Sequence, residues 1–231
     1  MNVTAIISCV VPSDLQYIRD ALVSVKEQTH PCRILLVVTE ETNLLEPIAE
    51  DLGIDLEAHI VSLSPAGVTK NLGVQKVATE WVAFLDADDR WKSEKIERQL
   101  AHASRTNSSA VGTRHLLIRE DGTPFFYAFA RKMPMPSSWL VKRNLMLTEP
   151  FSDLAQWEDA ELWKRLRQQS KAVTMRDFLL DYRVRPNSLS SAYGPAKRRK
   201  EKFARFAEMN KIRIFSLMIS RLVSIFISTD I

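Results

Sequence analysis

The stretch Trp81-Val82-Ala83-Phe84-Leu85-Asp86-Ala87-Asp88-Asp89 decides the fold, because a wholly apolar run passes directly into a cluster of carboxylates. The run Trp81–Leu85 is typical of a strand that is buried in a parallel sheet. Side chains two residues apart on an extended segment point the same way, so we expect Asp86 and Asp88 to converge. Converging carboxylates repel each other unless a cation lies between them, and their hard oxygen atoms suit Mg²⁺ or Mn²⁺.

The alternative is that these carboxylates are solvated turn residues that also cap the next helix. An isolated Asp-x-Asp is explained more often in this way than as a metal site. Asp89 or Ser93 can supply the cap here, which leaves Asp86 and Asp88 for a ligand.

Apolar runs alternate with amphipathic helical patterns through residues 1–107. We predict strands at Thr4–Val11, Arg33–Thr39, Leu56–Leu63 and Trp81–Leu85, and helices that begin near Asp14, Asn43, Ser64 and Ser93. This alternation is typical of βαβ units and a parallel sheet, in which ligands bind beyond the carboxyl ends of the strands. The polar segments Ser13-Asp14, Thr39–Asn43 and Asp86–Asp89 are therefore expected to meet at one edge of the sheet.

The pattern changes after residue 107. We predict a hairpin of Ala110–Arg119 with Thr123–Ala130, then a short helix or strand at Ser137–Arg143, a helix at Gln156–Gln169 and a strand at Ala172–Arg183. Trp139 lies in the region Phe125–Phe151, where an acceptor is expected to bind. It is a candidate to stack on a sugar ring, although a core position fits it at least as well.

Two further segments carry candidate chemistry. Glu158-Asp159 opens a helix whose other face is aromatic and aliphatic. The helix dipole alone favours acidic residues there, and the functional alternative is a general base. The segment Asp181–Ser190 is rich in residue types that bind phosphate, although an ordinary surface loop explains it as well.

In combination, these motifs resemble family 2 of the inverting glycosyltransferases, which have the GT-A fold. The resemblance covers residues 3–191 and follows the family's order of motifs. Gly67–Gly73 is similar to a family segment that ends in Arg-Asn-x-Gly, Phe84–Trp91 to its Asp-x-Asp motif, Glu158-Asp159 to its later Glu-Asp pair, and Tyr182–Ser190 to its closing loop. The implied fold is α/β, with a Rossmann-like, mostly parallel central sheet flanked by helices.

The resemblance also implies roles for individual residues. Asp88 would ligate the Mn²⁺ or Mg²⁺ ion that bridges the donor diphosphate, and Asp86 would contact the ribose or the metal. Lys70 would neutralise nucleotide or phosphate charge. Asp159 would deprotonate the acceptor hydroxyl, with Glu158 as the second candidate for the base, and one in-line displacement would invert the anomeric carbon.

Two departures from the family's pattern affect the donor side. The family commonly has Asp-Asp-Gly-Ser after its second strand, where an Asp reads the base of the nucleotide; here Glu40 is the expected substitute. The closing loop often carries His where this chain has Arg185. Arginine cannot ligate a metal, but it can hold a diphosphate in bidentate fashion. We therefore predict that Glu40, Arg185 and Pro12 bind the nucleotide-sugar together with Lys70 and Asp86.

The chain length of 231 residues suits one domain with an appendage. We expect residues 1–107 to be the nucleotide-sugar-binding half, 108–194 the acceptor-binding and catalytic-base half, and 195–231 a basic tail. The net charge is +4, but residues 197–231 hold nine Lys or Arg and three Asp or Glu. Because the positive charge is local, no nucleic-acid partner is expected.

The tail has a narrow polar stripe within an apolar segment, Ile212–Ser228, as expected for an amphipathic helix. It is too short and too charged to span a bilayer comfortably. Residues 197–228 are expected either to lie on a membrane surface, which suits a lipid-linked acceptor, or to pack on the domain or a second subunit. Without a signal peptide or metal-type cysteine spacing, the expected location is cytoplasmic, with the inner face of the plasma membrane as the peripheral alternative.

The sequence thus predicts an inverting glycosyltransferase that moves a sugar to a glycan or lipid-linked acceptor, in cell-surface polysaccharide or glycolipid synthesis. A catalytically silent nucleotide-sugar-binding module is the alternative, favoured slightly by Glu40. A nucleotidyltransferase is a third hypothesis. That chemistry is expected to use a Gly-rich loop with Lys or Arg after the first strand, and the sequence has no obvious loop of this kind there.

Overall fold

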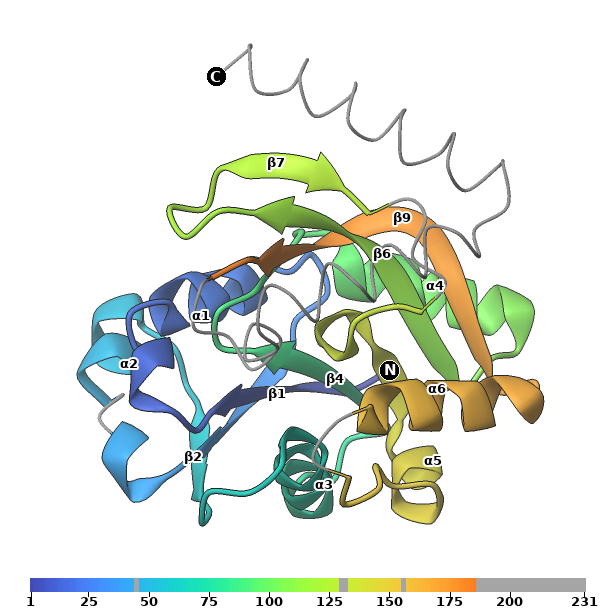
Figure 1. Ribbon diagram of the computed structural model, residues 1–231, viewed down its shortest axis with the longest axis horizontal. Coiled ribbons are helices and arrows are strands. Elements are labelled where there is room, and N and C mark those ends of the chain that lie inside the picture. The colour runs from blue at the N-terminus through green and yellow to red at the C-terminus, as the bar shows by residue number, and fades with distance from the viewer. Residues whose placement is uncertain (44–45, 129–132, 155–156, 186–231) are drawn as a thin grey trace, which may run out of the picture.

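The computed structural model describes residues 1–43, 46–128, 133–154 and 157–185, which form an α/β fold around one sheet (Figure 1). The predicted helical tail lies outside the described residues. The strands are β1 Val3–Cys9, β2 Arg33–Val38, β3 Glu57–Ile60, β4 Trp81–Asp86, β5 Arg90–Trp91, β6 Ala110–Ile118, β7 Pro124–Tyr127, β8 Leu140–Lys142 and β9 Ala172–Arg183. The helices are α1 Ile18–Lys26, α2 Glu46–Leu52, α3 Ala66–Lys76, α4 Lys95–Thr106, α5 Arg143–Thr148 and α6 Glu158–Gln168, with 3-10 turns η1 Pro12–Asp14, η2 Glu40–Thr42 and η3 Pro136–Ser138.

The first half of the sheet is parallel, as its continuous apolar runs predict. β3, β2, β1 and β4 lie side by side in that order, and the register pairs Ser8 with Asp86 and Cys9 with Val38. The carboxyl ends of β1, β2 and β4 are therefore level with one another. The three polar segments that follow these strands meet at one edge of the sheet, and this prediction is confirmed.

The second half makes the sheet mixed. β8 runs antiparallel to β4 and β6, β9 runs parallel to β6, and β5 runs antiparallel to β9. The predicted hairpin of β6 with β7 is present, and Gly122 takes the positive φ of 87° that its turn requires. The pairing of Arg90 with Asp181 brings the end of β9 next to the acidic segment that follows β4.

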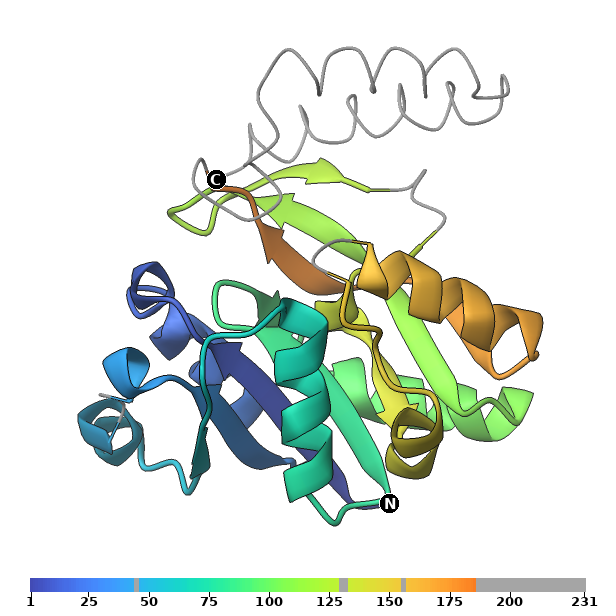
Figure 2. The same ribbon diagram turned by 60° about the horizontal axis from the view of Figure 1, so that its bottom comes forward.

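Helices cover both faces of the sheet (Figures 1 and 2). β1 shows the division, because Ala5 and Ile7 pack with α1 and α4 whereas Ile6 packs with α3, α5 and α6. Both clusters are apolar and buried, so the sheet is the middle of three layers. None of the helices formed by the described residues is long and apolar enough to span a membrane.

Several predicted details are wrong. The first helix begins at Ile18 and not near Asp14, because Pro12–Asp14 forms a 3-10 turn. α4 begins at Lys95 with no side-chain cap, so neither Asp89 nor Ser93 caps it. The residues between them include β5, a two-residue strand that the sequence analysis missed.

The structure also shows the surroundings of Trp139 and of the two cysteines. Trp139 is completely buried, stacks on Phe151 and donates its indole N–H to the carbonyl of Pro134, so it is a core residue. Both cysteines are free thiols; Cys9 is buried, and Cys32 is only half-buried.

Lys95 is an unusual core residue at the start of α4. Its side chain is completely buried, and its Nζ makes no hydrogen bond within the described part of the chain. The ammonium lies 3.9 Å from the centre of the Trp91 ring. Burial lowers the pKa of Lys95 to about 7, because an ammonium loses its hydration there.

Replacing Lys95 with Met is expected to stabilise the protein in a pH-dependent way. Between pH 7 and the ordinary lysine pKa of 10.5, the unfolded chain keeps a proton on Lys95 that the folded chain releases, so wild-type stability rises with pH. We expect Lys95→Met to raise the unfolding free energy by roughly 2–4 kcal/mol at pH 6, after allowing for the lost cation–π contact, and to lose this advantage towards pH 10. Urea unfolding across this pH range measures it, and an advantage independent of pH would contradict it.

Candidate active site

A cluster of carboxylates occupies the edge of the sheet where β1 and β4 end. Asp86, the last residue of β4, receives an ion pair from Lys70 Nζ at 2.6 Å on Oδ1. Its other carboxylate oxygen accepts a hydrogen bond of 3.1 Å from Ser137 Oγ, while the backbone N–H of Asp86 donates to the same hydroxyl. Asp86 is therefore held by α3 on one side and by η3 on the other.

Lys70 is a buried cation between two acidic groups. Burial alone would lower its pKa, but Asp86 first, and then Glu158 and Asp159, more than offset this, so the pKa of Lys70 is raised. Lys70 therefore stays protonated. Its charge links the acidic end of β4 to the acidic first turn of α6.

Asp88 pairs with a different cation, Arg185, which follows β9. Arg185 Nε donates to Asp88 Oδ2 at 2.6 Å, and a terminal nitrogen of the same guanidinium forms an ion pair with Asp14 of η1. Burial raises the pKa of Asp88, and the charge of Asp86 raises it further. Burial likewise raises the pKa of Asp14 to about 6. Three carboxylates thus lie close enough to oppose one another's ionisation.

Asp89 is a structural carboxylate, not a helix cap. It is buried, and its Oδ1 accepts the backbone N–H of Arg183 at 2.9 Å. Burial raises its pKa well above the ordinary value, and Asp88 and Asp86 add to this. A protonated Asp89 would leave the site with less negative charge to balance.

Arg183 fastens the acidic segment to the rest of the fold. Its buried guanidinium donates to the carbonyl oxygen of Asp88 at 2.8 Å, to Asp20 Oδ2 of α1 at 2.8 Å, and to the carbonyl oxygens of Arg119 and Glu120 in the hairpin turn. One side chain thus joins β9, α1, the hairpin turn and the segment after β4. We infer that Arg183 fixes where the Asp88 carboxylate lies.

The carboxylates at the start of α6 lie against α3. A Cβ atom added to Gly67 would come within 2.8 Å of Glu158 Cγ and of Phe151 Cβ, so only glycine allows this approach. Asn71 makes two hydrogen bonds to the backbone of Phe151, at 2.8 and 3.0 Å. The segment Gly67–Gly73 therefore positions the chain that leads into α6 and brings Lys70 to its acidic turn.

Glu158 and Asp159 differ in environment. Both are half-buried, and burial raises the pKa of Glu158. Asp159 Oδ1 accepts the backbone N–H of Ala160 at 2.7 Å. Trp157, just before them, has a φ of 68° and is 54% exposed, which is a strained backbone for a tryptophan at the entrance to this helix.

The other two predicted donor residues lie at the same edge of the sheet. Pro12 begins η1 directly after β1 and sets up the turn that carries Asp14. Glu40 begins η2 after β2 and is exposed to solvent. The hydroxyl of Thr42 donates to the carbonyl oxygen of Cys9 at 2.6 Å, which ties η2 to the end of β1.

Sequence reasoning missed part of this site. Ser137 was not singled out, and Arg183 was included only as part of the segment Asp181–Ser190. Asp14 was expected at this edge of the sheet together with Ser13, but its ion pair with Arg185 was not predicted. Ser137 and Arg183 have no local signature, since their partners are 51 or more residues away in the chain.

The donor set suits a divalent ion in its chemistry, since Asp86 and Asp88 offer hard oxygen ligands from one short segment. Each of these carboxylates, however, is already bound by a cation of the protein itself, Lys70 or Arg185. Within the described residues, no group of three or more His, Cys, Asp or Glu side chains is placed to hold a metal. A metal here would need Asp88 to exchange its partner, and water or a substrate phosphate would complete its coordination.

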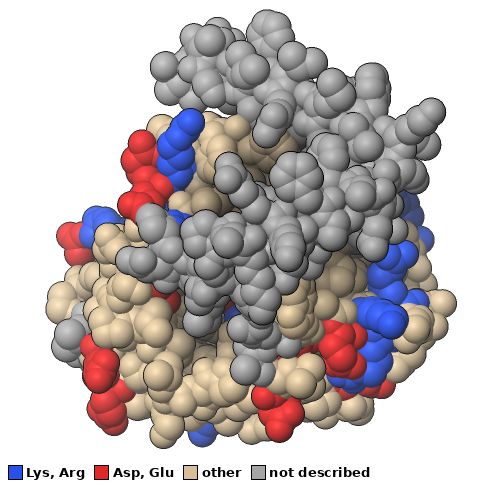
Figure 3. All heavy atoms as spheres, viewed as in Figure 1, with Lys and Arg blue, Asp and Glu red and all other residues tan. Residues whose placement is uncertain are grey.

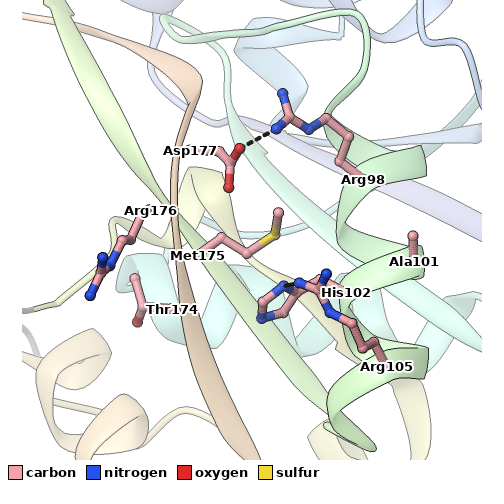
Figure 4. Close-up of a pocket in the computed structure, with 8 residues that line it drawn as sticks. All are labelled: Arg98, Ala101, His102, Arg105, Thr174, Met175, Arg176 and Asp177. Carbon is pink, nitrogen blue, oxygen red and sulfur yellow. Dashed lines mark hydrogen bonds and ion pairs between the residues drawn. The ribbon is translucent and has the colours of Figure 1, made fainter.

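A groove between α4 and β9 is separate from this site (Figure 4). It has a volume of about 580 Å³ and shares no residue with the acidic cluster. Arg98 and Asp177 form an ion pair across it, so its charge is partly balanced internally. On the face seen in Figure 3, described Lys and Arg side chains gather along the right-hand side, next to Asp and Glu side chains.

Replacing Arg183 with Met is expected to destabilise the fold strongly. It leaves buried carbonyl oxygens without donors and removes the ion pair to Asp20, so we expect a loss of about 3 kcal/mol of unfolding free energy. Arg19→Met is the matched control, because Arg19 pairs with Asp51 through side chains that are 56% and 63% exposed. That variant should change stability by less than about 0.5 kcal/mol. Equal losses in urea unfolding would contradict the role of Arg183.

Known proteins share this fold and parts of this sequence. The Bacillus subtilis (strain 168) protein TuaG, which is named as a glycosyltransferase of teichuronic acid biosynthesis, is 28% identical over 210 residues, covering 82% of this chain and 83% of TuaG. The structure is similar to residues 1–349 of S. aureus TarS in complex with UDP-GlcNAc, with a TM-score of 0.66, 18% identity and coverage of 84% of this chain.

A second structural relative is the mannosyltransferase PcManGT from Pyrobaculum calidifontis, in complex with GDP-Man and Mn²⁺. Its TM-score is 0.65 at 16% identity, with 91% of this chain covered. This chain spans only 62% of TarS 1–349 and 65% of PcManGT. These likenesses show the GT-A fold. The sequence model of "Glycosyl transferase family 2" matches residues 5–156, well over half of the 231 residues, and the chain therefore belongs to glycosyl transferase family 2.

Proposed function

We propose that this glycosyltransferase moves a sugar from a nucleotide-sugar donor to an acceptor hydroxyl with inversion at the anomeric carbon. The observation that carries the proposal is the position of Lys70, which pairs with Asp86 and interacts electrostatically with Glu158 and Asp159. A donor-binding cluster and a pair of candidate bases thus flank one buried cation. That is the arrangement that a single in-line displacement needs, with the leaving group on one side and the attacking hydroxyl on the other.

On the donor side, the first half of the domain, residues 1–107, supplies most of the binding groups. Lys70 and Arg185 are the cations available to a diphosphate, and the guanidinium can bind two phosphate oxygens at once. Asp86 contacts the ribose or the metal, and Pro12 and Glu40 form the edge that takes the nucleoside. When bound to Asp88 and Asp86, Mn²⁺ or Mg²⁺ supplies Lewis-acid stabilisation of the leaving diphosphate. Mn²⁺ in the PcManGT complex supports this cofactor.

On the acceptor side, residues 108–194 supply the base. Asp159 accepts the proton of the acceptor hydroxyl as that oxygen attacks the anomeric carbon, and Glu158 is the second candidate. Asp159 lies in the first turn of α6 next to the half-buried Glu158. The helix dipole favours a negatively charged side chain in this first turn.

The acceptor belongs to a cell-surface polymer. This assignment is supported by the name of TuaG, which refers to teichuronic acid biosynthesis, and by its similarity over most of both chains. A glycan or lipid-linked acceptor fits such a pathway. The alternative, a silent module that binds nucleotide-sugars, keeps Lys70 and the acidic cluster but predicts no turnover.

The proposal is tested by incubating the protein with a panel of UDP- and GDP-sugars and Mn²⁺, and measuring nucleoside diphosphate release. We expect one donor to be turned over, and Asp88→Asn to lower the rate at least 100-fold. Asp177→Asn is the matched control, because Asp177 lies in the groove between α4 and β9. Turnover that survives Asp88→Asn would rule out this mechanism, and no turnover with any donor would favour the silent module.

The two candidate bases can be separated by their variants and pH profiles. With Asp159 as the base, Asp159→Asn should lower kcat about 1,000-fold, and Glu158→Gln about 10-fold with an unchanged acidic limb. A base must be ionised, and burial raises the pKa of Glu158, so a Glu158 base would lose activity at a higher pH than an ordinary glutamate. The reverse ranking of the two variants would transfer the role to Glu158.

A further inference from the structure

Arg185 forms an ion pair with Asp88, the residue expected to ligate the divalent ion. Its guanidinium lies between two carboxylates, with Nε 2.6 Å from Asp88 Oδ2 and a terminal nitrogen paired with Asp14. A third nitrogen donates to Ser13 Oγ at 3.3 Å. The side chains of Arg185, Asp14 and Asp88 are only 11–14% exposed, so these contacts are largely shielded from water.

Losing this buried ion pair would have a larger energetic effect than losing a surface ion pair. Removing one partner of a buried pair leaves an uncompensated charge, which is far more unfavourable than breaking an exposed pair. Lys70 does not balance the charge of Asp88, because Lys70 is paired with Asp86. Among residues 1–185 that the structure describes, Arg185 is therefore the cation that pairs with the Asp88 carboxylate.

A metal ion and Arg185 cannot both use the same oxygen of Asp88. A guanidinium has no lone pair to offer a metal, so it cannot become a ligand alongside Asp88. Metal binding at that oxygen by the free protein must break the Nε contact to Asp88. Arg185 then keeps only its ion pair with Asp14 and its contact with Ser13. A diphosphate changes this balance, because its oxygens offer the guanidinium an equivalent bidentate partner.

We propose that Arg185 competes with the divalent ion for Asp88, so that metal and nucleoside diphosphate bind cooperatively. The free protein then binds Mn²⁺ weakly, and a nucleoside diphosphate raises the Mn²⁺ affinity by drawing Arg185 away from Asp88. By linkage, Mn²⁺ raises the affinity for the nucleotide by the same factor. The nucleotide part rests on the proposed function, whereas the competition for Asp88 does not.

The competition is tested by titrating the folded full chain with MnCl₂ alone and measuring free Mn²⁺ by electron paramagnetic resonance. We expect Arg185→Gln to bind Mn²⁺ at least 10-fold more tightly than wild type. The double variant Arg185→Gln/Asp88→Asn should lose that gain. Arg19→Gln removes the same charge from an exposed pair with Asp51 and should leave Mn²⁺ binding unchanged.

The cooperativity is tested by repeating the titration with UDP and then GDP. Wild type should gain at least 10-fold in Mn²⁺ affinity with one of them, and Arg185→Gln should gain less, because its Asp88 is already free. Arg185→Lys keeps the positive charge but loses the bidentate guanidinium. Its gain in Mn²⁺ affinity with the nucleotide should lie between those of wild type and Arg185→Gln. Thermal melting of every variant confirms that it is folded.

Each outcome bears on one part of the inference. If Arg185→Gln binds Mn²⁺ no more tightly than wild type, or if the gain persists without Asp88, the competition is wrong. If the nucleotide gain is equal in wild type and Arg185→Gln, the coupling through Arg185 is wrong. An absence of sugar transfer alongside tighter Mn²⁺ binding by Arg185→Gln would overturn the proposed function and leave the competition standing.

Discussion

The crowding of carboxylates at the carboxyl end of β4 is the constraint on which the site depends. Burial raises the pKa of Asp14 and of Asp88, and the charge of Asp86 raises both further. Such a cluster is stable only if cations reach it. Lys70 arrives from α3, whereas Arg183 and Arg185 arrive from β9 and the residues after it. Cations from the second half of the chain therefore balance carboxylates of the first half.

The parallel half of the fold was predictable because each of its strands carries its own signal. β1, β2 and β4 are continuous apolar runs, and the level carboxyl ends follow from parallel pairing. β5 was not predicted, and β8 lies within Ser137–Arg143, which the sequence left open as a helix or a strand. Two or three residues have no periodicity, and their pairing with β9, β4 and β6 depends on contacts between segments far apart in the sequence.

The residues of the candidate site also fall into those that the sequence predicted and those that it did not. Asp86, Asp88, Lys70 and the Glu158-Asp159 pair were found because they sit at fixed places in local motifs. The error over Asp89 shows the limit, since an acidic residue shortly before a helix looks like a cap in sequence. Its actual partner is the backbone N–H of Arg183, 94 residues later, and its burial is decided by the packing of β9. No local pattern encodes such a contact.

Lys70 gives the two sides of the site a means of influencing each other. Burial raises the pKa of Glu158, and the Lys70 charge acts against that rise, just as it balances Asp86. A phosphate that pairs with Lys70 would weaken the interaction of Lys70 with Glu158, and the pKa of Glu158 would then rise further. Donor binding would thus make Glu158, the second candidate for the base, more basic when an acceptor hydroxyl has a sugar to attack. The close approach of Gly67 to Glu158 keeps this side chain near Lys70.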